Sequence, residues 1–293
     1  MRGRNLTGAI AGAILITLVV AGCGRSDSGG SSEVSDEARS GAKASELVPD
    51  DVAKSGVLRV ATAEGYPPME MFKPGTQQLI GVDPDLAAAI ATQLDLRLDM
   101  VNASFPGLIP GLTADRWDLA MSSMSDTEER RQAVDFVDYF HAGGSIIVAK
   151  GNPEGVTDLE SLCGRDVVLA KGSSNLAIGE AQNEKCDDKM NISVSEDAPT
   201  GLLEIESGRS VASIVDYPVA KDIASSNDAY EVLEEQYEAG PWGVAVAKDD
   251  NELRDAVKVA LDELQESGKY AEVLEKWNVG ASAVDEVTIN DES

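Results

Sequence analysis

From Val57 onward, short apolar runs alternate with segments whose apolar residues recur at helical spacing, as they do in βα units. VLRVAT at 57–62 is a predicted strand, and residues 84–94 are a predicted helix with Asp83 as its N-cap and Pro84 at its first position. The elements that follow in this half are a strand around 96–100, a helix over 106–114, a strand over 118–122 and a helix capped by Thr127. This β, α, β, α, β, α order predicts a parallel sheet with right-handed crossovers.

A second α/β series follows the first. Its predicted elements are strands at 145–150 and 166–170, a helix at 175–183, and strands at 210–216 and 230–235. After this series the chain continues with a predicted strand at 243–247 and helices at 253–264 and 269–277. Two crossings, near Phe140–Gly144 and Ala239–Trp242, join the two halves of the chain. We therefore expect a two-lobed α/β clamshell with a two-segment hinge, in which each lobe is a mostly parallel sheet flanked by helices. The predicted division is lobe 1 at 47–141 plus 242–280, lobe 2 at 142–241, and a loosely held acidic tail at 281–293.

The first 22 residues have the pattern of an export signal. Two arginines precede an apolar run over residues 6–21, which is shorter than the roughly 20 residues of a comfortable membrane span. The run ends in Val-Ala-Gly-Cys, which resembles the lipobox of bacterial lipoproteins, so Cys23 is the predicted lipidation site; a plain signal peptide with an incidental cysteine is the alternative. Residues 23–46 are polar and rich in Gly and Ser, which predicts a flexible tether. We therefore expect a protein at the extracytoplasmic face of the bacterial cell membrane, held there by its lipid anchor alone.

Composition argues against several functions. The chain of 293 residues has 24 Lys and Arg against 52 Asp and Glu, a formal net charge of −28, whereas nucleic-acid binding draws on clustered basic residues. We therefore expect no nucleic-acid partner. The one histidine, His141, would have to carry any Ser-His-Asp triad or histidine-rich metal site alone, so we expect no catalytic residue, no metal and no other cofactor.

The remaining cysteines form a candidate disulfide. If Cys23 is lipidated, Cys163 and Cys186 remain as a pair in an exported, oxidising context where disulfides persist. A bridge between them would close a loop of about 24 residues, which stabilises by roughly 3 kcal/mol in the chain-entropy model.

Several polar and aromatic residues follow predicted strands, at the edge where open α/β sheets bind ligands. They are Tyr66, Phe105, Ser125, Arg130, Ser173, Ser174 and Asp216. Arg130 offers a bidentate fork for a carboxylate, and the serine pair lies at a helix N-terminus that favours an anion. Asp216 can pair with an ammonium group, and the two aromatic rings can contact the carbon portion between the charges. This pattern predicts a receptor for a zwitterion.

Longer runs carry a resemblance to a known family. They are VLRVATAEGYPPMEM, GVDPDLAAAIATQL, SFPGLIPGL, DLAMSSMSDTEERRQAVDFVDYF, IVDYP and WGVAVAKDDNELRDAVKVALDELQESGKYAEVLEKW. From about Val57 to Trp277, the chain resembles the substrate-binding proteins of polar amino-acid ABC importers (solute-binding protein family 3), which include glutamine, histidine and lysine-arginine-ornithine binders. The resemblance implies the periplasmic-binding-protein fold, no enzymatic activity, and two partners: a small polar amino acid and an ABC transporter permease. We expect the protein to be a monomer.

The resemblance also implies roles by matched position. Arg130 would hold the α-carboxylate with two backbone N–H groups, and Asp216 would hold the α-ammonium with a carbonyl and a hydroxyl group. The other contributors are the N–H groups of Ser125 and Ser174, the carbonyl of Ser123, the hydroxyl of Ser125, and aromatic walls formed by Tyr66 and Phe105. The sequence departs from the family at Ala63, where many relatives have an acidic residue, and at Ala170, where some have Lys or Leu. Glu64 is the candidate replacement for the missing acid, and its direction is open.

Two other functions remain as alternatives. The family also resembles cyclohexadienyl dehydratases, for which Glu64 or His141 would be the candidate general acid. A ligand sensor acting on a separate signalling partner is the other alternative.

Overall fold

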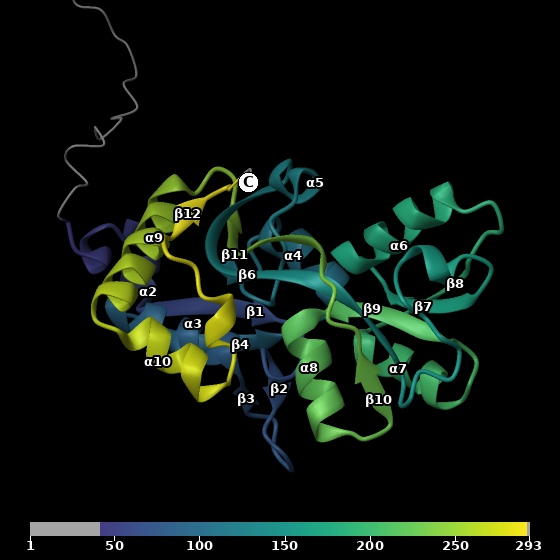
Figure 1. Cartoon of the computed structure of the whole chain (residues 1–293). Helices are drawn as coiled ribbons and strands as arrows, with labels where there is room; N and C mark the ends of the chain where they lie inside the picture. Colours follow the sequence, from purple (N-terminus) through teal and green to yellow (C-terminus); the bar gives the residue numbers. More distant parts are fainter. Residues whose placement is uncertain (1–41, 292–293) are drawn as a thin grey trace, which may run out of the picture. The chain divides into compact units, whose positions relative to one another are not determined.

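A mixed sheet runs through residues 42–291, the part of the chain that the computed structural model describes (Figure 1). Its strands are β1 Val57–Thr62, β4 Arg97–Asn102, β5 Leu119–Ala120, β6 Val134–Ala149, β7 Asp166–Ala170, β8 Asn191–Ser195, β9 Ala212–Asp216, β10 Tyr230–Val232, β11 Tyr237–Ala247 and β12 Thr288–Ile289. The main order is β4-β1-β5-β11-β6-β9-β7-β8, and β10 and β12 each pair with β6. A separate small sheet pairs β2 Met71–Phe72 with β3 Leu79–Ile80.

Lobe 1 is the part built around β1, β4 and β5. β1 pairs in parallel with β4, from Val57 opposite Arg97 to Thr62 opposite Asn102, and also with β5. Its helices are α2 Asp50–Ser55, α3 Val82–Gln93, α4 Leu108–Leu112, α5 Glu128–Arg131, α9 Asn251–Glu266 and α10 Lys269–Lys276, with 3-10 turns η1 Ala44–Glu46 and η2 Phe105–Gly107. Helices α3, α9 and α10 pack against one another, because each buries an apolar stripe, such as Leu86 and Ile90 of α3 (Figure 1).

Lobe 2 is the part built around β7, β8 and β9. β7 pairs in parallel with both of its neighbours, and the helices are α6 Ser174–Lys185, α7 Ala198–Glu206 and α8 Tyr217–Ser226, with a 3-10 turn η3 Glu160–Leu162. Sequence analysis did not predict β8, α7 or α8. β8 is an edge strand whose residues are mostly exposed or half-buried, so its sequence lacks the apolar signal of a core strand. Both lobes belong to one compact unit.

Two long antiparallel strands, β6 and β11, connect the lobes. In this part of the chain, sequence analysis predicted strands at 145–150 and 243–247 and crossing segments near 140–144 and 239–242. In the structure, β6 covers all of 134–149 and β11 covers all of 237–247. Phe140 of β6 stacks on Trp242 of β11, with ring centroids 4.9 Å apart. Both rings are fully buried, so the predicted crossing segments are paired strands within the core.

The start of α3 differs from its prediction. The helix begins at Val82, after Gly81, whose φ of 140° is one that glycine adopts readily. A side chain on Gly81 would also meet the Met69 carbonyl oxygen at 2.0 Å. Asp83, predicted as the N-cap, therefore lies inside the first turn with its carboxyl group fully buried, and it becomes part of the floor described below.

The C-terminal segment is ordered in the structure, which corrects the expectation of a loosely held tail. A 3-10 turn, η4 Gly280–Ser282, is followed by the fully buried Val287 and by β12, which pairs with β6. The Asn290 side chain accepts a hydrogen bond from the Phe136 N–H at 2.8 Å. This part of the predicted acidic tail therefore packs on lobe 1, up to residue 291.

The predicted disulfide between Cys163 and Cys186 is confirmed. Their Cα atoms lie 5.5 Å apart, and the bond ties the C-terminal end of α6 to the segment after η3. The predicted signal peptide, Cys23 and the predicted tether up to residue 41 lie outside the described residues. The end of the predicted tether is wrong, because Ala44–Glu46 form η1 and the buried Ala44 donates its N–H to Glu263 of α9. Within 42–291, no helix has the length and apolarity needed to cross a membrane.

Candidate functional site

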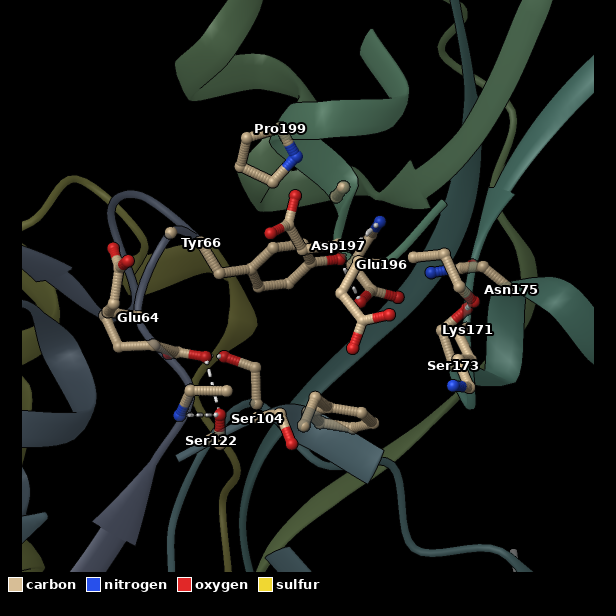
Figure 2. Close-up of a pocket in the computed structure, with 18 of the residues that line it drawn as sticks. Glu64, Tyr66, Ser104, Ser122, Lys171, Ser173, Asn175, Glu196, Asp197 and Pro199 are labelled. Carbon is tan, nitrogen blue, oxygen red and sulfur yellow. Dashed lines mark hydrogen bonds between the residues drawn. The ribbon is translucent and has the colours of Figure 1, made fainter. Parts of the chain in front are cut away.

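A cavity of about 370 Å³ lies where loops of the two lobes face each other (Figure 2). Lobe 1 contributes the loops after β1, β4 and β5, and lobe 2 contributes the loops after β7, β8 and β9. The structure places all nine predicted ligand-binding residues around this cavity: Glu64, Tyr66, Phe105, Ser123, Ser125, Arg130, Ser173, Ser174 and Asp216. The carboxyl ends of the strands meet here because each β-α connection leaves its sheet on the same edge.

Tyr66 and Asp216 join the lobes at one side of the cavity. The Tyr66 hydroxyl donates to Asp216 Oδ2 at 2.5 Å, and the Asp216 N–H donates to the Tyr66 hydroxyl oxygen at 3.2 Å. Burial raises the pKa of Asp216, while hydrogen bonds from Tyr66 and Asn175 and the charge of Arg130 act in the opposite direction. Burial and the neighbouring Asp216 charge raise the pKa of Tyr66 well above its usual range, so the phenol stays protonated and donates. Tyr66, predicted as an aromatic wall, therefore also fixes the orientation of Asp216.

Arg130 contacts both lobes. Its Nη1 donates to the Ser125 carbonyl at 2.7 Å, and its Nη2 donates to the Gly172 carbonyl of lobe 2 at 3.1 Å. The guanidinium carbon lies 5.4 Å from the centroid of the Phe105 ring. Burial lowers the pKa of Arg130, and Asp216 is the strongest opposing influence. A guanidinium carries five N–H donors, so this contact pattern leaves donors for an anionic ligand.

The N-terminus of α6 supplies a second anion-favouring feature beside Arg130. The Ser173 hydroxyl caps the helix by accepting from the Leu176 N–H at 3.1 Å, so this hydroxyl is already committed to the backbone. The Ser174 hydroxyl lies 3.0 Å from the Ser125 hydroxyl across the two lobes. Free N–H groups at the start of a helix stabilise negative charge. Arg130 lies beside this helix start, because its Nη2 donates to the Gly172 carbonyl.

A buried acidic floor lies beneath the lobe 1 side of the cavity, and sequence analysis did not predict it. Glu70, 1% exposed, accepts from the Ser122 hydroxyl at 3.0 Å and from the Ser123 hydroxyl at 3.1 Å. Asp83 accepts from the Ser123 N–H at 2.7 Å and from the Tyr139 hydroxyl at 2.6 Å. These contacts hold Ser123 in a left-handed conformation with φ of 48°.

The two floor carboxyl groups share a low-dielectric site. Burial, followed by the charge of Asp83, raises the pKa of Glu70 well above its usual range. Burial also raises the pKa of Asp83 to about 6, against the opposing effect of the bonds from Tyr139 and Ser123. In the sequence, Glu70 is a lone acid within the apolar run PPMEMF. A charged side chain in such a run is either buried with hydrogen-bonding partners or exposed at the edge of a strand.

The rim of the cavity carries further charges. Glu196, Asp197 and Lys171 line it from lobe 2, and all three are exposed. Asp197 caps α7 by accepting from the Thr200 N–H at 2.8 Å. Figure 2 shows Glu196 reaching into the space beside the Tyr66 ring, whereas Glu64 lies on the other side of that ring. Glu196 and Asp197 were missed because they follow β8 and open α7, two elements that the sequence did not reveal.

His141 is exposed on β6 and does not line the cavity. Among residues 42–291, no group of three or more His, Cys, Asp or Glu side chains could hold a metal ion.

Comparisons with known proteins agree on one family. Residues 58–280 match the bacterial extracellular solute-binding proteins, family 3. The chain is 29% identical over 252 residues to the arginine-binding protein ArgT of Corynebacterium glutamicum, covering 84% of this chain and 82% of that protein.

Two solved structures share this fold. An ancestral arginine-binding protein bound to arginine has a TM-score of 0.72 and 32% identity, covering 76% of this chain and 98% of the other. AncCDT-1, an ancestral amino acid-binding protein and precursor of cyclohexadienyl dehydratase, has a TM-score of 0.72 and 31% identity, covering 79% and 99%. Since the family match spans most of the chain and the two-lobed fold agrees with it, the protein belongs to the bacterial extracellular solute-binding proteins, family 3.

Proposed function

We propose that this protein captures a polar α-amino acid outside the cytoplasm and delivers it to the permease of an ABC importer. The observation that carries the proposal is the placement of Arg130 and Asp216, two buried or half-buried groups of opposite charge, around one cavity shared by both lobes. An α-amino acid has opposite charges on adjacent groups, so it can satisfy both residues at once.

The ligand's α-carboxylate would lie against Arg130 and the N–H groups of Ser125 and Ser174. Its α-ammonium would lie against Asp216, the Ser123 carbonyl and the Ser125 hydroxyl. The Phe105 ring, already stacked beside the Arg130 guanidinium, would cover the carbon atoms together with Tyr66. These proposed ligand contacts follow from where the residues lie around the cavity.

We further propose that the ligand's side chain is cationic. The acidic residues around the cavity are Glu64, Glu70, Glu196, Asp197 and Asp216, against the basic residues Arg130 and Lys171. A ligand carboxylate bound by Arg130 leaves this surplus of acids facing the remainder of the ligand, which favours positive charge there. Two of the similar proteins are arginine-binding by name, in agreement with this choice.

Calorimetric titration with a panel of free amino acids tests the proposal. We expect one cationic amino acid to bind tightest and its α-amide and its deaminated analogue to bind at least about 10-fold more weakly, because each lacks one charge of the zwitterion. Native mass spectrometry of the freshly purified protein should reveal the same amino acid as a co-purified ligand. Equal affinity for the analogues would contradict the zwitterion site.

Binding without turnover is the proposed activity, in spite of the dehydratase precursor among the similar structures. Of the two candidate general acids, His141 lies away from the cavity, and Glu64 is exposed at its rim. Incubation with prephenate, followed by product analysis, would reveal a dehydratase. We expect no product above the level formed without protein.

Membrane attachment through Cys23 and a monomeric state complete the proposal. Cys23 lies outside the described residues, so the proposal rests on the Val-Ala-Gly-Cys run after the apolar segment. We expect Cys23→Ala to move the protein from the membrane fraction to the soluble fraction. A variant that stays in the membrane fraction would contradict lipid anchoring.

A further inference from the structure

We infer that Glu196, on the lobe 2 rim, is the residue that recognises the cationic side chain of the ligand, in place of an acid from lobe 1. The inference rests on the proposed function and names the group that would select the ligand. In the sequence, Ala63 stands where an acid was expected, and Glu64 was the candidate replacement. The structure offers Glu196 from the opposite lobe instead.

The backbone that carries Glu196 is held in place on both sides. Before it, the Ser195 hydroxyl donates to the Asp197 carbonyl at 2.8 Å. After it, Asp197 caps α7, and Pro199 lies against lobe 1, where a Cβ built on Gly65 would be 3.5 Å from Pro199 Cγ. The loop that bears Glu196 therefore lies directly across from the segment that contains Ala63.

The Glu196 carboxyl group is available for a ligand. In the described part of the chain it has no hydrogen-bond or ion-pair partner, and it reaches into the space beside the Tyr66 ring (Figure 2). The cationic groups around the cavity are Arg130 of α5, assigned to the ligand carboxylate, and Lys171 of the loop before α6, whose N–H donates to the Ser195 carbonyl at 3.0 Å, next to Glu196. A ligand with its carboxylate against Arg130 would direct its side chain away from that guanidinium.

The other acids around the cavity are less suited to this role. Glu70 is buried and already accepts two serine hydroxyl groups. Asp197 Oδ1 is committed to the cap of α7, and Asp216 to Tyr66. Glu64 is exposed, as Glu196 is, and it lies on the other side of the Tyr66 ring from Glu196 (Figure 2). Glu196 therefore combines a carboxyl group without a partner among the described residues with a position in the space beside the Tyr66 ring.

The test compares L-arginine with L-glutamine by calorimetry for four proteins: the unchanged chain, Glu196→Gln, Glu64→Gln and Glu184→Gln. Glu184 is an exposed acid on α6 outside the cavity, so its variant controls for the change in net charge. We expect Glu196→Gln to weaken arginine binding by roughly 5- to 20-fold and glutamine binding by less than about 2-fold, because only arginine loses an ion pair. Glu184→Gln should bind both ligands like the unchanged chain.

A double variant, Ala63→Asp with Glu196→Gln, sharpens the test. It returns one negative charge to the cavity from lobe 1, and we expect it to regain most of the lost arginine affinity. The inference is overturned if Glu196→Gln binds arginine as tightly as the unchanged chain, or if Glu64→Gln shows the selective loss instead. Failure of the unchanged chain to bind any amino acid would overturn the proposed function, whereas tighter binding of glutamine than of arginine would overturn this inference and the proposed cationic side chain, but not amino-acid capture.

Discussion

The two walls of the cavity are built in different ways. The lobe 1 wall rests on a buried floor, in which Glu70, Asp83 and the serine pair Ser122-Ser123 satisfy one another through hydrogen bonds. The lobe 2 wall combines the buried Asp216 and the N-terminus of α6 with exposed charges on loops, above all Lys171 and Glu196. The disulfide secures the C-terminal end of α6.

This difference separates two tasks of recognition. A floor with every partner in place holds its geometry, because moving one group leaves another buried without a hydrogen bond. Exposed rim charges have no such constraint, so they can be exchanged with little effect on folding. The lobe 1 wall, together with the buried Asp216 of lobe 2, therefore suits the part that all α-amino acids share, and the exposed lobe 2 rim suits the part that differs among them.

The strongest expected effect concerns the support of the lobe 2 wall. Replacing both Cys163 and Cys186 by Ser should lower the free energy of unfolding by about 3 kcal/mol, because the unfolded chain regains the freedom of a long loop. The corresponding fall in the melting temperature is roughly 6–12 °C for a protein of this size, measured by calorimetry. Reductant should destabilise the unchanged chain and leave the double variant unaffected; equal melting temperatures would mean that lobe 2 does not depend on the bridge.

Arg130→Ala should weaken binding of every amino acid by roughly 10- to 150-fold. Charged hydrogen bonds contribute about 1.5–3 kcal/mol, and this side chain contacts both lobes as well as the proposed carboxylate position. Because the loss concerns the shared part of the ligand, arginine and glutamine should be affected equally in calorimetric titrations. A loss confined to one amino acid would break the division of tasks between the walls.

The pH dependence of stability should come chiefly from lobe 1. Burial, reinforced by Asp138, raises the pKa of Asp126 to about 7, against the opposing effect of Arg131. A folded-state pKa above the ordinary value of 3.8 means that the folded chain retains a proton that the unfolded chain releases, so this group favours folding increasingly as the pH falls from about 7 toward 4. Asp83 and Asp138, each with a pKa raised to about 6, act in the same direction.

We therefore expect the melting temperature to rise as the pH is lowered from 8 to 5.5. Over this range Asp126 should add about 2 kcal/mol to the free energy of unfolding. Asp126→Asn, which cannot ionise, should reduce this rise. Glu196→Gln, on the exposed lobe 2 rim, should leave the rise unchanged. Identical pH profiles for the unchanged chain and Asp126→Asn would show that this lobe 1 acid does not titrate in the range considered.

The smallest expected effect is local to lobe 2. Asp197→Ala removes the carboxylate that caps α7 by accepting from the Thr200 N–H. This change should lower the free energy of unfolding by about 1 kcal/mol. The melting temperature should fall by roughly 2–4 °C. Asp197→Asn retains an acceptor and serves as the matched control. If arginine affinity instead fell as far as in Glu196→Gln, the two rim acids would share the role assigned to one.

Sequence patterns predicted the part of the fold whose signals are local. The buried strand VLRVAT and the amphipathic α9 stand out because burial and periodicity coincide, and the site loops follow such strands directly. Sequence analysis missed β8 and α7 because many of their residues are exposed or half-buried, which weakens the apolar pattern. It missed Glu196 because this residue lies between the two elements. Glu70 was missed for a different reason: its partners Ser122, Ser123 and Asp83 are distant in sequence and meet only through the sheet.

The long strands between the lobes also have a mechanical consequence. β6 and β11 form a paired strip that resists stretching and bends or twists more readily, as β-ribbons do. Gly143 and Gly144 in this strip serve close packing, since a Cβ on Gly144 would lie 2.2 Å from Asn175 Oδ1. The pairing of β11 with β6 changes register between Tyr237 and Gly240 and again between Trp242 and Gly243. These positions interrupt the ladder, so a rotation of one lobe against the other would be taken up there.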